Sequence, residues 1–100
     1  MSSTPVSGGI ATARLPNGID LQYRETGERD GIPLILLHGV TDSLHAWKPF
    51  TDALPSSIRA IALTQRGHGD SSKPADGYES AAFSADIFAF MDNLGIRHAH

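Results

Sequence analysis

The stretch LILLHGVTDS at residues 34–43 decides the fold of this chain. Four aliphatic residues are followed by the pair His38 and Gly39 and then by small polar residues. A continuous apolar run without alternation is typical of a strand that is buried on both faces of a parallel sheet. We therefore predict an α/β fold in which residues 32–37 form such a strand and a helix begins soon after it.

Working outward from this stretch, the predicted strands and helices alternate along most of the chain. The Pro-Asn-Gly turn at residues 16–18 predicts an antiparallel hairpin before the central strand. The predicted strands are residues 10–15, 19–25 and 58–63, with 96–100 as the entry to a fifth strand. The predicted helices are residues 44–54, capped by Thr41 or Asp42, and 80–94, closed by Gly95. The fold class is α/β, with a hairpin leading into a mostly parallel sheet with flanking helices.

Apolar residues recur at helical spacing in both predicted helices. In the first helix they are Leu44, Trp47, Phe50 or Thr51, and Leu54; in the second they are Phe83, Ile87, Phe90, Met91 and Leu94. We interpret these stripes as core. Asp86 and Asp92 are expected on the solvated face of the second helix.

Domain organisation follows from the central strand. A strand that is apolar on both faces requires a neighbour on each side, and the strand at residues 58–63 supplies one. We expect residues 1–9 to form a flexible leader and residues 10–100 to form the N-terminal part of a single, larger domain.

The composition excludes several classes of protein. The chain has 100 residues, 40% hydrophobic and 19% charged, with a net charge of -3 and scattered Lys and Arg, so we expect no nucleic-acid partner. It contains no cysteine, which suits a reducing compartment. No apolar run approaches the roughly 20 residues that span a bilayer, and the first residues lack the features of a secretory signal. We expect a soluble, cytoplasmic protein with no membrane partner.

The strand-to-helix turn at residues 38–40 carries the first candidate chemistry. A sharp bend after His38 and Gly39 would free the Val40 backbone N–H from the strand ladder, near the positive end of the following helix. Such a donor stabilises an oxyanion in a transition state. We expect His38 and Gly39 to shape this turn, with His38 bracing it rather than titrating. A tight turn without function remains the alternative.

The loop TQRGHGDSSKP at residues 64–74 adds a second motif. Together, the two motifs resemble the α/β-hydrolase fold family, in which a strand ends in H-G-x and the next strand is followed by D-x-R-G-x-G-x-S. The matching residues are His38, Gly39, Arg66, Gly67, Gly69 and Ser71. Thr64 departs from the pattern because it stands where the family usually has Asp. The resemblance covers residues 10–100.

The resemblance implies a function for the complete protein. It implies a cofactor-independent hydrolase acting on an ester or another small acyl substrate, with a nucleophile, acid and His that follow His100 in that order. The Val40 N–H would form half of the oxyanion hole, and Leu44 and Trp47 would border the substrate pocket. By itself, the 100-residue segment is expected to be inactive.

Two alternatives remain open. Relatives with an Asp nucleophile open epoxides or displace halide and carry the same turn, although Asn or Pro commonly follows their His-Gly pair where this chain has Val40 and Thr41. A non-catalytic binding or signalling protein on the same scaffold is the other alternative, because fold does not determine function.

The remaining histidines support no further site. We expect His45 to lie on the surface and His68 to serve the loop. His98 and His100 alternate like strand residues, but no carboxylate or cysteine spacing accompanies them, so no metal site is predicted.

Overall fold

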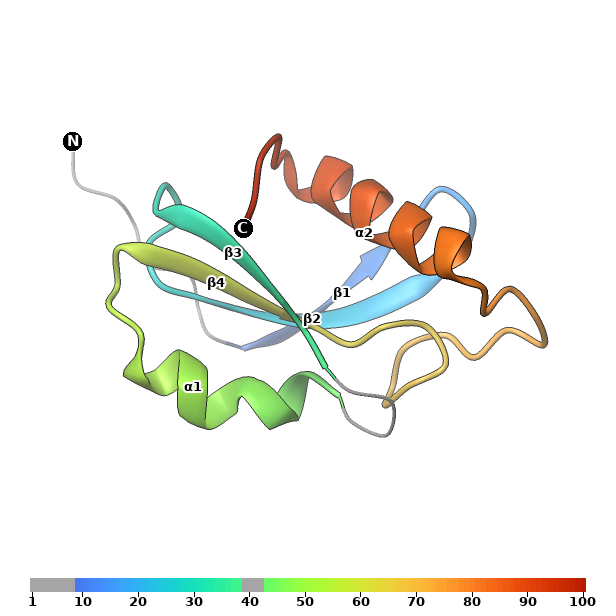
Figure 1. Ribbon diagram of the computed structural model, residues 1–100, viewed down its shortest axis with the longest axis horizontal. Coiled ribbons are helices and arrows are strands. Elements are labelled where there is room, and N and C mark those ends of the chain that lie inside the picture. The colour runs from blue at the N-terminus through green and yellow to red at the C-terminus, as the bar shows by residue number, and fades with distance from the viewer. Residues whose placement is uncertain (1–8, 39–42) are drawn as a thin grey trace.

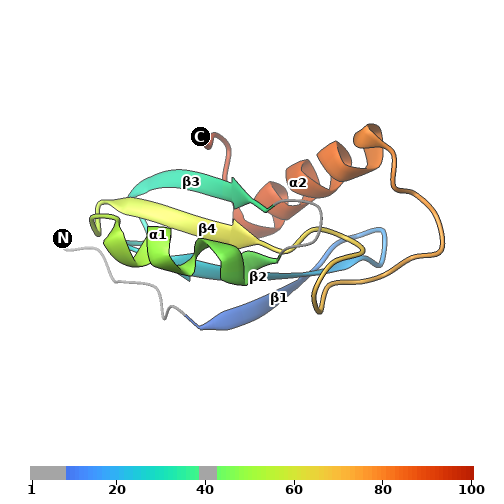
Figure 2. The same cartoon turned by 60° about the horizontal axis from the view of Figure 1, so that its bottom comes forward.

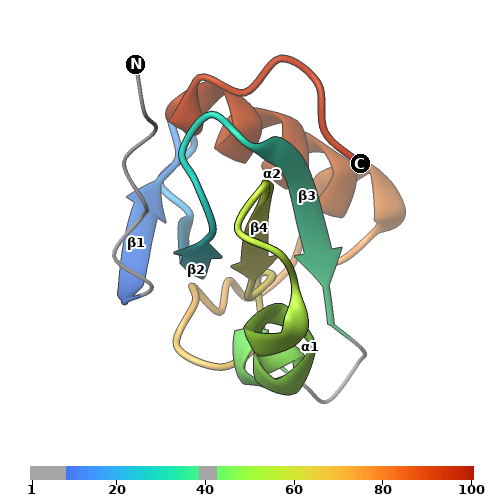
Figure 3. The ribbon, with the colours of Figure 1, turned by 90° about the vertical axis from the view of Figure 1, so that its left-hand side faces the viewer.

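A computed structural model describes residues 9–38 and 43–100 of the chain. Within these residues, a mixed four-stranded sheet has the strand order β1-β2-β4-β3. The helices η1 (Leu44–Trp47) and α1 (Lys48–Ala53) lie on one face of the sheet, and α2 (Ser80–Leu94) lies on the other (Figure 1). The end-on view in Figure 3 shows this three-layer arrangement. It confirms the predicted α/β class.

The N-terminal hairpin forms as the sequence predicts. Strands β1 (Ile10–Arg14) and β2 (Asp20–Thr26) are antiparallel, with Arg14 opposite Asp20. The turn between them is closed by hydrogen bonds from Gly18 N to Leu15 O (2.9 Å) and from Leu15 N to Ile19 O (2.9 Å). The hairpin joins the rest of the sheet because β2 also pairs antiparallel with β4.

The two central strands form the parallel part of the sheet. Strands β3 (Ile32–Leu37) and β4 (Ile58–Leu63) are parallel and in register, with Leu37 beside Leu63. On the other side of β3, Ile35 N donates to His100 O (2.8 Å) and His100 N donates to Pro33 O (2.9 Å). This is the hydrogen-bond pattern of a parallel pair. His100, the last residue of the strand entry predicted at residues 96–100, therefore lies beside β3.

The first helical segment starts at Leu44 as predicted and ends at Ala53, one residue before the predicted end, but its first turn is of another type. It begins as the short 3₁₀ helix η1, and its N-cap is Ser43, whose Oγ accepts a hydrogen bond from His45 N (3.4 Å). The predicted caps Thr41 and Asp42 lie outside the described residues. Thr51 is buried, whereas Phe50 is 46% exposed, so Thr51 is the residue that faces the sheet. As Figure 2 shows, η1 and α1 run along the sheet.

The main hydrophobic core lies between α2 and the sheet. Its buried members are Ala13, Leu15, Leu21, Ile61, Leu63, Phe90 and Ile96. The Phe90 ring is fully buried and meets Tyr23 edge to face, with ring centroids 5.1 Å apart. Burial of a side chain of this size contributes about 1.5–3 kcal/mol to the free energy of unfolding. The predicted helix bounds and the stop at Gly95 are confirmed.

Strand β4, rather than β3, is the fully covered strand of the described sheet. Ile61 and Leu63 belong to the core under α2, so the alternation of side chains along a strand turns Ala60 and Ala62 toward η1 and α1. All four are buried, whereas Ile32 and Leu37 of β3 are 53% and 41% exposed. Among the described strands, β3 is the outer one in the order β1-β2-β4-β3. Its burial on both faces stays a prediction for the larger domain.

Candidate functional site

The candidate site lies where β3 and β4 end. Because the strands are parallel and in register up to Leu37 and Leu63, the residues that follow them, His38 and Thr64, lie at the same edge of the sheet. In α/β proteins, ligands bind beyond the carboxyl edge of parallel strands. His38 and the start of the predicted loop therefore meet at the edge where a site is expected.

His38 links the end of β3 to the loop after β4. The His38 ring is 8% exposed, and its Nε2 accepts a hydrogen bond from the Gln65 backbone N–H (2.9 Å). A ring nitrogen that accepts from an amide is unprotonated, so this contact requires Nε2 to carry no hydrogen. The ring also packs against His68, with centroids 4.7 Å apart, and His68 Nδ1 lies 2.9 Å from Arg66 O.

Thr64 makes a second link, to the start of η1. Its side chain is buried, and its Oγ1 accepts a hydrogen bond from the Leu44 backbone N–H (2.9 Å). Its own backbone N–H donates to Gln22 O (2.8 Å). The hydroxyl that departs from the family pattern is thus a buried acceptor that joins β4 to η1.

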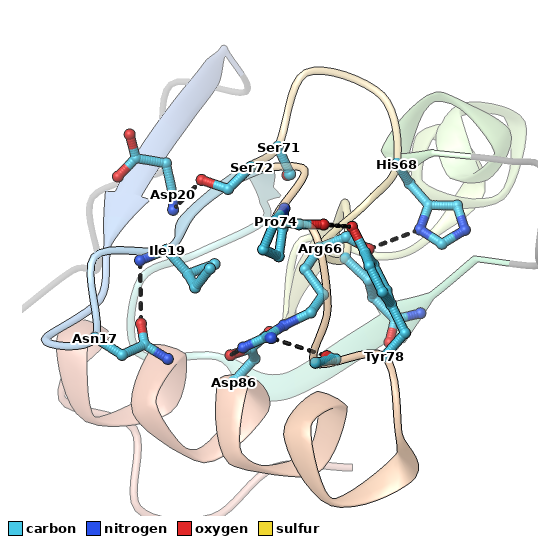
Figure 4. Close-up of polar contacts among 12 residues, drawn as sticks. Asn17, Ile19, Asp20, Arg66, His68, Ser71, Ser72, Pro74, Tyr78 and Asp86 are labelled. Atoms are coloured by element: carbon cyan, nitrogen blue, oxygen red, sulfur yellow. Dashed lines mark hydrogen bonds and ion pairs between the residues drawn. The ribbon is translucent and has the colours of Figure 1, made fainter.

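Two serines fasten the loop to β2. Ser71 Oγ donates to Thr64 O (2.7 Å) and accepts from Gln22 N (2.9 Å). Ser72 Oγ accepts from Asp20 N (2.8 Å), as drawn in Figure 4. These contacts explain why small hydroxyl residues occupy these positions. Each hydroxyl supplies a hydrogen-bond partner to a strand backbone group that no neighbouring strand pairs at that point.

A buried ion pair fastens the same loop to α2. Arg66 donates from Nε and Nη2 to the two carboxylate oxygens of Asp86, at 2.6 and 2.7 Å, and from Nη1 to Gly77 O at 2.9 Å. Both side chains are less than 10% exposed. The hydrogen bonds to Asp86 raise the pKa of the Arg66 guanidinium above its usual value. The prediction of a solvated Asp86 is wrong because this carboxylate is turned inward to neutralise Arg66 (Figure 4).

The spacing of apolar residues in the sequence could have predicted that Asp86 is buried. Asp86 lies three residues after Phe83 and four before Phe90, which places it on the apolar face of α2. A carboxylate in that position needs a buried cation, and Arg66 is the loop residue that supplies it. Asp92, by contrast, is exposed as predicted.

The predicted site residues are only partly within the described structure. Gly39 and Val40 lie outside the described residues, so their proposed roles stay predictions. Leu44 is 1% exposed. Trp47 packs edge to face against Phe50, with ring centroids 5.7 Å apart, and its Nε1 is enclosed without a hydrogen-bond partner among the described residues. Contact of Leu44 and Trp47 with substrate also stays a prediction.

Residues 9–38 and 43–100 contain no cluster of three or more His, Cys, Asp or Glu side chains that could hold a metal ion. No helix in this part of the chain is long and apolar enough to cross a bilayer. His45 is exposed, as predicted.

Comparison with known proteins identifies the family. Residues 32–100 match the sequence profile described as the alpha/beta hydrolase fold. The chain belongs to this family. It is 32% identical over 91 residues to a non-heme chloroperoxidase of Streptomyces lividans, covering 90% of this chain and 33% of that protein. It is 35% identical over 79 residues to a soluble epoxide hydrolase of Corynebacterium sp. (strain C12), covering 79% of this chain and 27% of that protein.

Solved α/β-hydrolase structures agree with this assignment. The crystal structure of an E-2-(acetamidomethylene)succinate hydrolase superimposes with a TM-score of 0.78 at 34% sequence identity. The match covers 91% of this chain and 34% of that one. The chain therefore spans about a third of the length of the relatives that it matches.

Proposed function

We propose that residues 10–100 form the N-terminal part of a larger α/β-hydrolase domain. We further propose that the complete protein cleaves an ester or another small acyl substrate by Ser-His-acid catalysis, without a cofactor. The observation that carries the proposal is the hydrogen bond from Gln65 N to His38 Nε2, which ties the end of β3 to the loop after β4. The lack of cysteine supports a cytoplasmic location.

In this mechanism the turn predicted at residues 38–40 supplies part of the oxyanion hole. The Val40 backbone N–H donates to the oxygen that becomes negative when the nucleophile attacks the acyl carbon. The backbone N–H next to the nucleophile supplies the second donor. His38 and Gly39 shape the turn that presents the first donor. The nucleophile, the acid and the catalytic His belong to the part of the domain that follows His100.

The geometry of His38 argues against a role as the general base. A general base accepts a proton through a nitrogen with a free lone pair, and the Nε2 lone pair of His38 is occupied by the Gln65 amide. The histidine that follows the strand is therefore better suited to hold the turn than to move protons. This agrees with a mechanism in which the base comes from a later segment.

A hydrolase with an Asp nucleophile is the second candidate, because several of the relatives are named as epoxide hydrolases. The residues after His38 and Gly39 favour acyl transfer, since Val40 and Thr41 stand where Asn or Pro commonly follows in the Asp-nucleophile relatives. A non-catalytic protein on this scaffold is the third candidate. The identity of the nucleophile, which is Ser, Asp or absent, distinguishes the three candidate functions.

The role of the Val40 backbone N–H as an oxyanion donor can be tested with a substitution that removes this N–H. In the protein translated from the full reading frame, Val40→Pro deletes the backbone N–H, and Val40→Ala is the matched control that keeps it. Loss of one oxyanion donor lowers kcat by about 10²–10³-fold. We expect this loss of p-nitrophenyl acetate hydrolysis for Val40→Pro, and near wild-type turnover for Val40→Ala. Equal turnover of the two variants would contradict the proposed role.

The nucleophile can be identified by intact mass after labelling. A fluorophosphonate that reacts with an activated serine should add one adduct to the full-length protein. An ester adduct formed from styrene oxide, without a fluorophosphonate adduct, would show the second candidate to be right. Neither adduct and no turnover would support the non-catalytic candidate.

A further inference from the structure

The turn between β1 and β2 carries an Asn-Gly pair, Asn17 and Gly18, that the proposed function does not use. Both residues are exposed. A Cβ added at Gly18 would meet no atom within 4 Å, so this peptide is open to water on the outside of the fold. An asparagine in such a pair can react with its own main chain, because glycine has no side chain to keep its backbone nitrogen away from Cγ.

One hydrogen bond holds the Asn17 side chain in position for this reaction. Ile19 N donates to Asn17 Oδ1 (3.1 Å), as Figure 4 shows. A side-chain oxygen that accepts from the amide two residues on is folded back over the intervening peptide, which contains the Gly18 nitrogen. The same N–H stabilises the negative charge that Oδ1 acquires when a nitrogen attacks Cγ. The turn therefore both positions and activates the side-chain amide.

A second hydrogen bond opposes the reaction, but only weakly. Gly18 N donates to Leu15 O (2.9 Å), and this nitrogen has to leave that bond and lose its hydrogen in order to attack. A backbone hydrogen bond of this kind slows the step by roughly 2-fold to 10-fold. Because the bond closes an exposed turn, we expect it to open locally while the rest of the sheet stays folded.

Other side chains of the chain lack this combination. Asp30 and Asp76 also precede glycine, but an ionised carboxylate has no amine to lose and resists attack by a nitrogen. The second of the two asparagines is Asn93, which is exposed but lies inside α2. The nitrogen after Asn93 belongs to the helix and to a residue with a side chain. Asn17 is therefore the side chain that meets every requirement.

We propose that Asn17 is a site of spontaneous covalent modification, at which the chain loses ammonia and forms aspartate and isoaspartate. The Gly18 nitrogen forms a bond to Cγ, the bond from Cγ to Nδ2 breaks, and Nδ2 leaves as ammonia with the hydrogen of the attacking nitrogen. Water then opens the cyclic imide. Opening at Cγ gives aspartate, and opening at the main-chain carbonyl gives isoaspartate, whose main chain runs through Cβ and Cγ. The reaction does not depend on the proposed function.

The isoaspartate product changes the hairpin itself. It adds a methylene to the main chain between Leu15 and Ile19, which close the turn through the bond from Leu15 N to Ile19 O (2.9 Å). Leu15 is a buried member of the core. We therefore expect the isoaspartate form to have a lower Tm than the unmodified protein.

The test is incubation of the full-length protein at about pH 8, followed by peptide mapping with mass spectrometry. We expect the peptide that contains Asn17 to convert to two products in which OH replaces NH₂, and the Asn93 peptide to stay unchanged. The rate in the folded protein should lie within about 10-fold of the rate in urea, because one hydrogen bond protects the nitrogen. A larger ratio, or equal conversion of Asn93, would overturn the inference.

Two glycine variants separate reaction in the folded turn from reaction after unfolding. Gly18 and Gly95 have φ values of +84° and +71°, and an added Cβ meets no atom within 4 Å at either position. Gly18→Ala should abolish the conversion, because its Cβ obstructs the nitrogen. Gly95→Ala is the matched control, since it strains the backbone at the end of α2 and should lower Tm without changing the rate at Asn17. Conversion in Gly18→Ala at the wild-type rate, or about 10-fold faster conversion in Gly95→Ala as its lower stability would cause after global unfolding, would overturn the inference.

Discussion

The two ends of the parallel pair β3 and β4 are held in different ways. At the amino ends, the preceding segments are held by backbone, since Glu28 N donates to Ser56 O (2.8 Å) and Ile32 N donates to Ser57 O (3.0 Å), and one side-chain ion pair joins Arg59 of β4 to Glu25 of β2. At the carboxyl ends, side chains of His38, Thr64 and Ser71 bond to backbone groups of other segments. The carboxyl ends thus depend on residue identity.

This difference separates the amino ends of the strands, which support the fold, from the carboxyl ends, which carry the proposed function. Backbone contacts tolerate most side chains and demand only close approach, whereas a side-chain contact specifies one donor or acceptor at one distance. A catalytic group must be held to a fraction of an ångström by such contacts. The end of the sheet that carries the proposed chemistry is also the end where side chains set the geometry.

The largest effect is expected at the buried ion pair of the carboxyl end. Asp86→Ala leaves the Arg66 guanidinium buried without its partner, and breaking a buried pair in this way costs about 3–5 kcal/mol. We expect a loss of this size in the free energy of unfolding measured with urea. Asp92→Ala, at an exposed position of the same helix, is the control and should change it by less than about 0.5 kcal/mol. A similar small change in Asp86→Ala would contradict this account of the loop.

At the amino end, we expect the largest loss of stability from a substitution at Gly27. Gly27 has a φ of +83°, and a Cβ added there would lie 1.9 Å from Ile58 O. Because the neighbour is strand backbone, the strand itself would have to move. We expect Gly27→Ala to lower the free energy of unfolding by about 3 kcal/mol, combining backbone strain with overpacking.

Gly67 at the carboxyl end is the matched comparison. Its φ is +81°, and an added Cβ would lie 2.5 Å from the Tyr78 ring. Tyr78 is 43% exposed, so its side chain can swing outward. We expect Gly67→Ala to cost about 1–2 kcal/mol, the strain of the left-handed backbone alone. If urea unfolding shows Gly67→Ala to be the more damaging change, the contrast between backbone and side-chain contacts is wrong.

The smallest effect is expected at the exposed pair of Arg14 and Asp20. The hydrogen bond from Arg14 lowers the pKa of Asp20 below its usual value of 3.8. A carboxyl with a lowered pKa in the folded state stabilises the protein above the unfolded pKa, and this stability is lost as the pH falls through the folded pKa. Asp20→Asn should therefore lower Tm slightly at pH 5 and by less at pH 2. A Tm difference that is equal at the two pH values would contradict this assignment.

Several features of the fold could be predicted because they are local. The Pro-Asn-Gly turn positions β1 and β2, and the apolar spacing from Phe83 to Leu94 predicts α2 to the residue. These features depend on a few neighbouring residues, whose conformational preferences and periodicity are written in the sequence itself. The prediction of the first helix was less accurate, because it missed the 3₁₀ start, where Leu44 N donates to the distant Thr64 side chain.

By itself, the sequence determined the order of the strands and helices and their bounds to within one residue, and the motif pair around His38 and Arg66 that indicates the family. Only the tertiary structure decided that β4 is the covered strand, that Asp86 faces Arg66, and that Thr64 holds Leu44. The physical reason is distance along the chain. Asp86 and Arg66 are 20 residues apart, as are Thr64 and Leu44, and such partners are selected by strand order and packing rather than by local periodicity.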